Sequence, residues 1–237
     1  MKGTAVLLVA GVAAYWWWRY RGPGRTSSIP GRGGRITGAG ASADAHAREL
    51  RTPLVRLATA VGIRTRAEAR AKRFEKGATG ERYVAKLLEP LIGEGWVFFA
   101  DCALPRGKAN IDILAISPRG LVVVVDPKKW WGRLTVRNNR LMHGVKDVSG
   151  RLRGLDYEAR TVSSLLRVPV VPVAAMVGPM KPGTMLRFRG IRLVPATDVP
   201  ELLRALDRKH RPTVPAAQLV AAARLLLPPK TGRKTVR

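Results

Sequence analysis

The sequence is poor in the residues that build disulfides and zinc sites. It has one cysteine, Cys102, in 237 residues, which excludes an internal disulfide and any zinc cluster made of cysteines. A lone cysteine is typical of a reducing compartment, and we interpret Cys102 as a small buried residue. The three histidines have neither ligand spacing nor a neighbouring nucleophile, so we interpret them as structural or surface residues: His46, His143 and His210.

Acidic residues are also scarce. The chain has 16 Asp and Glu against 43 Lys and Arg, which gives a net charge of +27 at pH 7. Such an excess indicates a polyanionic partner, either nucleic acid or an anionic membrane surface, and carries no information about the fold. The hydrophobic fraction of 46% is ordinary for a globular protein, and the length suffices for one domain with extensions.

An apolar run without charged residues occupies residues 4–18, TAVLLVAGVAAYWWW. As a helix rising about 1.5 Å per residue it covers roughly 22 Å, less than the ~30 Å hydrocarbon core, although the aromatic residues at its end lengthen the usable span. We predict a transmembrane anchor over residues 1–20. The alternative is a signal peptide cleaved after Ala14, which would leave three tryptophans at the new N-terminus. More positive charge follows the run than precedes it, which predicts a single-pass protein with the rest of the chain in the cytoplasm.

The remaining chain divides into three parts. Residues 21–62 are a basic linker rich in Gly, Ser, Pro and Arg, with a helix over 44–62. Residues 63–210 form the main domain. There, a capping box at Thr65 to Glu68 begins a helix to about Lys76, GATGE (77–81) interrupts it, and an amphipathic helix follows to about residue 92. Residues 211–237 are a C-terminal helix, 215–227, and a basic tail.

The rest of the main domain alternates short strands with helices, which predicts an α/β fold. The predicted strands are 96–101, 109–116, 121–126, 133–136, 140–143, 168–177 and 191–194. The predicted helices are 147–167 and 198–208.

One hairpin brings two carboxylates together. Ser117-Pro118-Arg119-Gly120 suits a type I turn with Gly in the left-handed conformation, which makes a three-residue hairpin with a bulge. Ser117 then pairs with Leu121, and the register sets Asp112 opposite Asp126. Like charges directly opposed are destabilising unless a cation lies between them, and two carboxylates with waters suit Mg2+. Lys128 follows Asp126 on the same face of the strand.

Glu81 is a third candidate carboxylate. It precedes Val84, Ala85 and Leu88 by three, four and seven residues, which places it at the edge of the buried stripe of a helix. The alternative is a glutamate in the first helical turn, where the helix dipole favours a negative charge.

These residues resemble a known pattern. An acidic residue on a helix, then Asp, then Asp-X-Lys across a hairpin resembles the PD-(D/E)XK nuclease superfamily. More narrowly, GATGERYVAKLLEPL and ALPRGKANIDILAISPRGLVVVVDPKKWWGRL are similar to the NERD (nuclease-related domain) family, from about Gly77 to Leu134. The resemblance implies a nuclease-like α/β core of a helix, an antiparallel hairpin or meander, a second helix and further strands.

The resemblance also implies roles for individual residues. It assigns catalytic positions to Glu81, Asp112, Asp126 and Lys128. Asp112 and Asp126 would bind Mg2+ or Mn2+ with help from the Pro127 carbonyl, and Glu81 would ligate through water or hold a second ion. Pro127 is unusual in an inner strand because proline has no backbone N–H to donate to the neighbouring strand, so we expect a local bulge there.

Residues beside this site are candidates for binding nucleic acid, DNA in preference to RNA. Lys129, Trp130, Trp131 and Arg133 could grip phosphate and stack on bases, or one tryptophan could cover the core while the cations are solvated. Asn110 shares the face of Asp112 and could orient the substrate or the lysine. Two functions remain open: a membrane-anchored, metal-dependent nuclease, or a catalytically inactive, membrane-tethered nucleic-acid-binding module.

Overall fold

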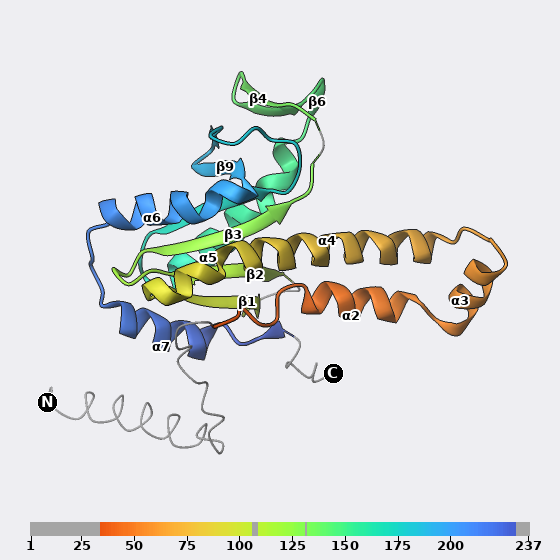
Figure 1. The fold of residues 1–237 in the computed structure, drawn as a ribbon, viewed down its shortest axis with the longest axis horizontal. Coiled ribbons are helices and arrows are strands. Elements are labelled where there is room, and N and C mark those ends of the chain that lie inside the picture. Colours follow the sequence, from red (N-terminus) through yellow and green to blue (C-terminus); the bar gives the residue numbers. More distant parts are fainter. Residues whose placement is uncertain (1–33, 106–108, 131, 231–237) are drawn as a thin grey trace, which may run out of the picture. The chain divides into compact units, whose positions relative to one another are not determined.

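The computed structural model describes residues 34–105, 109–130 and 132–230 (Figure 1). The chain divides into two compact units, Met1–Gly31 and Arg32–Arg237, and the described residues all belong to the second. The predicted anchor at 1–20, with its signal-peptide alternative, and Trp131 therefore lie outside the described residues. None of the helices within the described ranges has the length and apolar character needed to cross a bilayer.

Six strands of the described chain form one mixed sheet, which confirms the predicted α/β class. The strand order is β1-β2-β3-β7-β9-β8, in which β1, β2 and β3 are an antiparallel meander and β3, β7 and β9 are parallel. The bounds are β1 (Val97–Ala103), β2 (Asn110–Ile116), β3 (Val122–Lys128), β7 (Val170–Met176), β8 (Leu186–Phe188) and β9 (Ile191–Pro195). The three residues of β8 are too few to show an alternation, and the sequence did not predict it.

A small second sheet follows β3 in the chain. It comprises β4 (Leu134–Arg137), β5 (Arg140–His143) and β6 (Lys146–Asp147). The predicted hairpin turn at Asn138 and Asn139 is confirmed, and both residues have the positive φ, 48° and 55°, that a type I′ turn requires.

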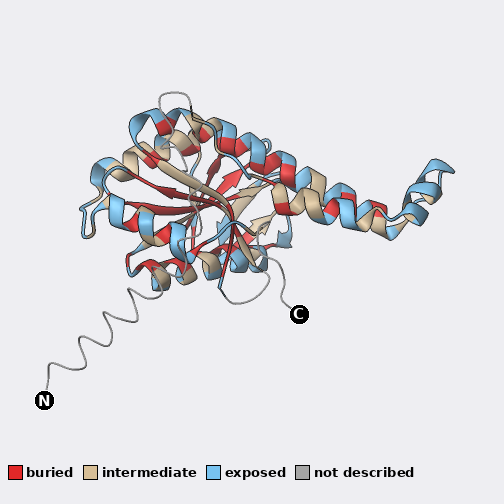
Figure 2. Ribbon diagram, turned by 90° about the horizontal axis from the view of Figure 1, so that it is seen from below, coloured by how far each residue is buried: buried red, intermediate tan, exposed pale blue. Residues whose placement is uncertain are grey.

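Helices cover both faces of the large sheet (Figures 1 and 2). On one face lie α4 (Arg66–Leu88) and α6 (Val199–Lys209), and on the other lie α5 (Arg153–Leu166) and α7 (Ala216–Leu226). The four valines of β3 divide between the two cores, with residues 122 and 124 facing α5 and residues 123 and 125 facing α4. All four are fully buried, as a strand covered on both faces should be. Short 3-10 helices occupy Glu89–Glu94, Ser149–Leu152 and Ala196–Asp198.

An N-terminal arm is built from α2 (Ala41–Leu50), α3 (Pro53–Ala60) and the first half of α4. The predicted single helix over 44–62 is wrong, because Pro53 begins a new helix and disfavours helical backbone at Thr52 before it. The predicted interruption of α4 at GATGE is also wrong. The Thr65 cap is confirmed, with the Glu68 N–H donating to Oγ1 at 3.1 Å, and the helix then continues to Leu88. Packing against α2 outweighs the cost, about 1 kcal/mol each, of the two helical glycines.

Candidate functional site

The β2–β3 hairpin has the register that the turn predicted. The Ser117 N–H donates to the Leu121 carbonyl at 2.9 Å, and Gly120 has a φ of +80° and donates to the Ser117 carbonyl at 3.0 Å. The pairing runs from this turn to Ile113 opposite Val125, where the ladder ends. One further step of the same register sets Asp112 opposite Asp126.

The two aspartates fall in the class of pairs whose side chains approach most closely. Ser117 and Leu121 are hydrogen-bonded, so alternate pairs along the ladder are hydrogen-bonded and the pairs between them are not. If the ladder continued regularly for one more step, Asp112 and Asp126 would be a non-hydrogen-bonded pair with Cα atoms about 4.5 Å apart. Asp126 is buried, and Asp112 is partly exposed.

Lys128 is the cation nearest to this pair. Its Nζ lies 2.6 Å from Oδ2 of Asp126, and its side chain is 27% exposed. Burial acts to lower the pKa of Lys128, but the carboxylates of Asp126, Asp112 and Glu158 together outweigh burial and raise it. The pKa of Asp112 is raised well above its usual value by burial first and then by the negative charges of Asp126 and Glu81. The structure thus joins Asp112, Asp126 and Lys128 in one electrostatic site.

Glu81 reaches the same site from α4. It is buried, as the sequence predicted, and the first-turn alternative is wrong because α4 begins at Arg66. Its Oε2 accepts a hydrogen bond of 2.9 Å from the backbone N–H of Gly40, which precedes α2. Burial raises the pKa of Glu81, the hydrogen bond from Gly40 opposes this, and the charges of Asp101 and Asp126 raise it further.

Gly40 holds a position that no other residue could take without a shift. It has a φ of +78°, and a Cβ there would lie 2.9 Å from three atoms of Ala78 in α4. The close approach of α2 to α4 therefore requires glycine at this point. The same close approach directs the Gly40 N–H toward Glu81, which lies about one helical turn after Ala78 in α4.

Asp101 is a buried acid that the sequence interpretation missed. It accepts hydrogen bonds from the Ser42 N–H at 2.9 Å, from Ser42 Oγ at 2.7 Å and from Asn110 Nδ2 at 2.9 Å. The other end of the Asn110 amide, Oδ1, accepts from Lys230 Nζ at 3.0 Å. The β1–β2 register sets Asp101 opposite Asp112, on the other side from Asp126. Asn110 is thus bound to Asp101 and Lys230, which are not the partners that the sequence suggested.

Glu158 on α5 was also missed. It lies three residues after Leu155 and four before Val162, both buried, so it belongs to the face of α5 that covers the sheet. Burial, and then the charge of Asp126, raise the pKa of Glu158 to about 8, while Lys128 opposes them. An acidic residue within an apolar helical stripe is the signal that could have identified it.

The acidic cluster, defined here as Glu81, Asp112, Asp126 and Glu158, has more negative charge than the Lys128 ammonium can balance. Carboxylate oxygens are the ligands that Mg2+ and Mn2+ prefer, and the surplus of negative charge favours a cation. Across the described ranges, however, no three acidic, histidine or cysteine side chains converge closely enough to hold a metal ion as they stand. The donor set fits a divalent ion in chemistry, and an ion at Asp126 would bind Oδ1 or displace the Lys128 ammonium from Oδ2.

Pro127 does not disturb the sheet. The β3–β7 register is unbroken from Val122 opposite Val170 to Lys128 opposite Met176, so the predicted bulge is wrong. The Lys128 carbonyl accepts from the Val177 N–H on the β7 side, which turns the backbone groups of Pro127 to the β2 side. There the ladder has already ended, so no donor is missed, and the Pro127 carbonyl points to the edge that carries the aspartates.

The predicted nucleic-acid-binding residues lie just beyond β3. Lys129 and Arg133 are exposed, whereas Trp130 is partly buried against the core with the Arg151 guanidinium 5.7 Å from its ring centre. The alternative that one tryptophan covers the core therefore describes Trp130. A cavity of about 710 Å³ adjoins these residues, and its lining includes Trp130, Arg133, Leu134, Met176, Met180 and Lys181.

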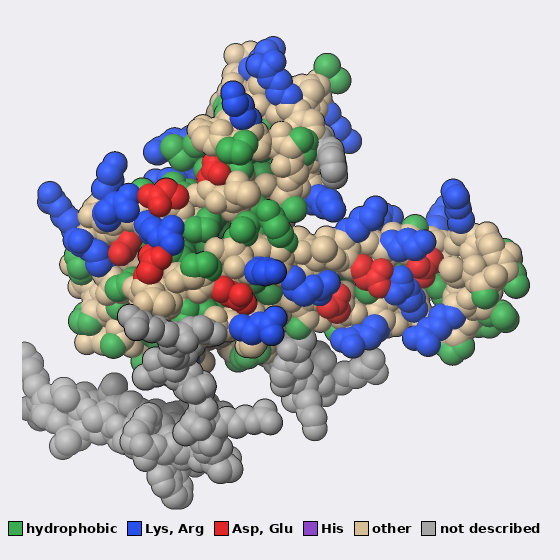
Figure 3. Space-filling model, viewed as in Figure 1, with side chains coloured by type: hydrophobic (Ala, Val, Ile, Leu, Met, Phe, Trp, Pro, Cys, Tyr) green, Lys and Arg blue, Asp and Glu red, His purple; other side chains and the backbone are tan. Residues whose placement is uncertain are grey.

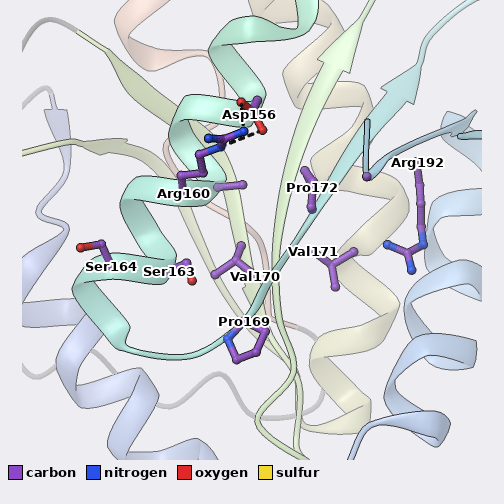
Figure 4. A pocket seen from close by; sticks show the side chains of 11 residues that line it. Asp156, Arg160, Ser163, Ser164, Pro169, Val170, Val171, Pro172 and Arg192 are labelled. Carbon is purple, nitrogen blue, oxygen red and sulfur yellow. Dashed lines mark hydrogen bonds and ion pairs between the residues drawn. The ribbon is translucent and has the colours of Figure 1, made fainter. Parts of the chain in front are cut away.

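A second hollow, of about 620 Å³, lies between α5 and the start of β7 (Figure 4). Its carboxylate, Asp156, is paired with Arg160 at 3.1 Å, and Nε of Arg192 has no hydrogen-bond partner among the described residues. The hollow is lined by residues 170–172 of β7, whereas the site lies at the last residues of β3. Because the two strands are parallel, the hollow is at the other end of the sheet and is not part of the site.

Comparison with known proteins bears out the resemblance. Residues 76–177 match the NERD family, described as a nuclease-related domain. The matched segment contains all members of the acidic cluster and Lys128, whereas Gly40 and Ser42, which hydrogen-bond to acidic residues at the site, precede it. No curated protein and no solved structure matches the chain.

Proposed function

Because residues 76–177 form a nuclease-related domain, we propose that the protein is a divalent-metal-dependent nuclease that hydrolyses phosphodiester bonds of nucleic acid. One observation carries the proposal: at the end of the β2–β3 ladder, Asp126 pairs with Lys128 and its charge raises the pKa of Asp112, so the three side chains form one site. A protein that only binds nucleic acid gains nothing from buried carboxylates, because they repel phosphate. A cleavage site needs them.

Asp112, Asp126 and the Pro127 carbonyl would hold Mg2+ or Mn2+, with Glu81 acting through water or on a second ion. The ion would neutralise charge on the scissile phosphate and lower the pKa of the attacking water. The N–H of Gly40 fixes one oxygen of Glu81, which leaves the other oxygen to orient a water. The Lys128 ammonium, released from Asp126, would orient the attacking water or stabilise the negative charge that develops on the phosphate.

Substrate binding follows from the charge and from the cavity beside the site. A net charge of +27 favours any nucleic acid, and we propose DNA in preference to RNA. Arg133 and Lys181 would contact phosphate at the mouth of the cavity, with Trp130 offering a ring edge to a base. The single-pass N-terminal anchor with a cytoplasmic domain also remains a proposal, supported by the apolar run at 4–18 and the positive charge that follows it.

The second candidate is a catalytically inactive nucleic-acid-binding module. It is favoured by the 2.6 Å ion pair that closes Lys128 onto Asp126, and by the lack of converged metal ligands in the part of the chain that the structure describes. An inactive site of this kind would keep the ion pair as an internal contact of the fold.

Cleavage and melting assays on the same full-length protein distinguish the two. Single-stranded DNA, duplex DNA and RNA are incubated with and without Mg2+ or Mn2+, and thermal unfolding is followed under the same conditions. If the protein is a nuclease, we expect metal-dependent cleavage and a rise in Tm when the metal ion is added. Both effects should be lost in Asp126→Asn and kept in Asp156→Asn, whose carboxylate pairs with Arg160 on the surface. If the wild-type protein binds nucleic acid but neither cleaves it nor gains stability from either ion, it is the inactive module.

A further inference from the structure

The end of the N-terminal arm exposes large apolar side chains. Leu54, Leu57, Val61 and Ile63 are 78%, 64%, 65% and 59% exposed, and no residue of α3 is buried. We call these four residues the apolar tip. Figure 2 shows the tip of the arm coloured as exposed, and Figure 3 shows hydrophobic side chains at the same end. Aliphatic side chains this exposed and this close together mark an interaction surface.

The apolar tip is one face of a helix with a defined start. Leu57 and Val61 follow Leu54 by three and seven residues, so the three side chains lie on the same side of α3 and its C-cap. Arg56 lies on the opposite side. Thr52 caps the helix, with its Oγ1 accepting from the Val55 N–H at 3.4 Å. Ile63 extends the surface just after the helix, where its N–H is bound to the Ala58 carbonyl at 2.8 Å.

The charged residues within the tip segment, residues 52–66, all have one sign. The sequence contains no Asp or Glu between Glu49 and Glu68, and three arginines in this stretch are exposed: Arg56, Arg64 and Arg66. A surface of this kind is complementary to a partner that is both apolar and negatively charged. Nucleic acid supplies the charge but no face for four aliphatic side chains, whereas a bilayer with anionic headgroups supplies both.

The arm fixes the position of this surface. The guanidinium of Arg51, at the end of α2, hydrogen-bonds to both oxygens of Glu68 at 3.0 Å and is also paired with Glu75, both on α4. This pairing binds the α2–α3 junction to a helix whose other half is packed on the sheet. The apolar tip is therefore carried on a supported element, on the arm and away from the acidic cluster.

We propose that the apolar tip docks onto an anionic lipid surface, with its four aliphatic side chains at the acyl–headgroup boundary and the arginines on the headgroups. The contact is independent of the nuclease reaction and of any membrane-spanning segment. It would hold the domain in a fixed orientation at a bilayer, with α3 in contact and the sheet beyond it.

The test places an environment-sensitive fluorophore at the apolar tip of the full-length chain. Leu57→Cys is labelled with NBD, and the native Cys102 does not compete, because it is 2% exposed and burial raises the pKa of its thiol to about 12. The matched control is Val145→Cys, which is 98% exposed at the β5–β6 turn. Both proteins are measured with phosphatidylcholine vesicles, with and without phosphatidylglycerol, after their Tm values are shown to equal that of wild type.

We expect a blue shift of the emission at position 57, and quenching by lipids labelled in their acyl chains, with phosphatidylglycerol vesicles only. Position 145 should show neither. Adding Arg56→Gln and Arg64→Gln should weaken vesicle binding by about 25-fold, roughly fivefold for each arginine near the surface. The proposal is overturned if position 57 stays solvent-like on anionic vesicles, or if its emission shifts with protein concentration or with nucleic acid in the absence of lipid. These last outcomes would assign the surface to self-association or to nucleic acid.

Discussion

Replacing Asp112 by asparagine should stabilise the metal-free protein at alkaline pH. The charge of Asp126 raises the pKa of Asp112, and asparagine keeps the shape of the Asp112 side chain while removing its negative charge. Two unit charges about 5 Å apart repel each other by about 3 kcal/mol at an effective dielectric constant of about 20. The Lys128 ammonium on Asp126 offsets part of this repulsion, so we expect Asp112→Asn to raise the unfolding free energy by about 1–3 kcal/mol near pH 8.

The gain should depend on pH in a defined direction. The pKa of Asp112 in the folded protein is raised well above its usual value. As pH rises from about 4 through the folded pKa, the unfolded chain loses its proton first, and wild type loses stability. Below about pH 4 both states carry the proton, so wild type and Asp112→Asn should have the same stability. The difference between them should therefore appear only as pH rises.

Thermal melting between pH 3 and pH 9 measures this difference. A gain of 1–3 kcal/mol corresponds to a Tm increase of roughly 3–10 °C for a domain of this size. Mg2+ should raise the Tm of wild type at pH 8 and leave that of Asp112→Asn unchanged. Asp156→Asn is the control, because its surface pair with Arg160 should change stability by less than about 1 kcal/mol. A lower Tm for Asp112→Asn at pH 8, or a pH profile identical to that of wild type, would refute the reasoning.

Three further substitutions test other contacts of the site. Lys128→Met leaves the buried Asp126 carboxylate without its cation and should destabilise the protein by about 3 kcal/mol. Mg2+ should restore part of this stability, whereas the cleavage assay should still detect no activity. Gly40→Ala should lower the unfolding free energy by about 3 kcal/mol in denaturant unfolding, because its Cβ would lie 2.9 Å from α4. Gly62→Ala is the control: it also has a positive φ, +83°, but open space around it, so it should cost about 1 kcal/mol. Equal effects of the two substitutions would contradict the packing argument. Burial raises the pKa of the Glu158 carboxyl to about 8, so wild type loses stability as pH rises from about 4, where the unfolded chain ionises, to about 8. Glu158→Gln should therefore match the Tm of wild type near pH 4 and exceed it at pH 7 and pH 9.

The hairpin that carries the site was predictable because its information is local. Four residues, Ser117 to Gly120, determine the turn type, the turn determines the register, and the register determines which carboxylates oppose each other. The buried valines of β3 were predictable for a related reason, since an uninterrupted β-branched run suits a strand covered on both faces. Both inferences depend on residues that are close in the sequence, within a single hairpin or a single strand.

The parts that the sequence did not predict depend on distant segments. The hydrogen bond from Gly40 to Glu81 joins residues 41 positions apart, and no local pattern indicates it. The same packing of α2 on α4 keeps α4 helical through GATGE, against the local preference of its glycines. Glu158 enters the site only because α5 returns to cover β3, which is a property of the topology and not of its own neighbours.

The position of the acidic cluster follows from the end of the β2–β3 ladder. Within the ladder, α4 and α5 are separated by the sheet, so Glu81 on one helix and Glu158 on the other could not influence the same residue. Beyond Val125 the pairing with β2 stops, and the charge of Asp126 then raises the pKa of both glutamates as well as that of Asp112. Pro127 is compatible with the same geometry. Its nitrogen, which carries no N–H, faces the side of β3 on which pairing with β2 has already ended. A shift of the turn by one residue would move Asp126 to the other face of the strand, away from α5, so the type I turn is as necessary to the site as the carboxylates themselves.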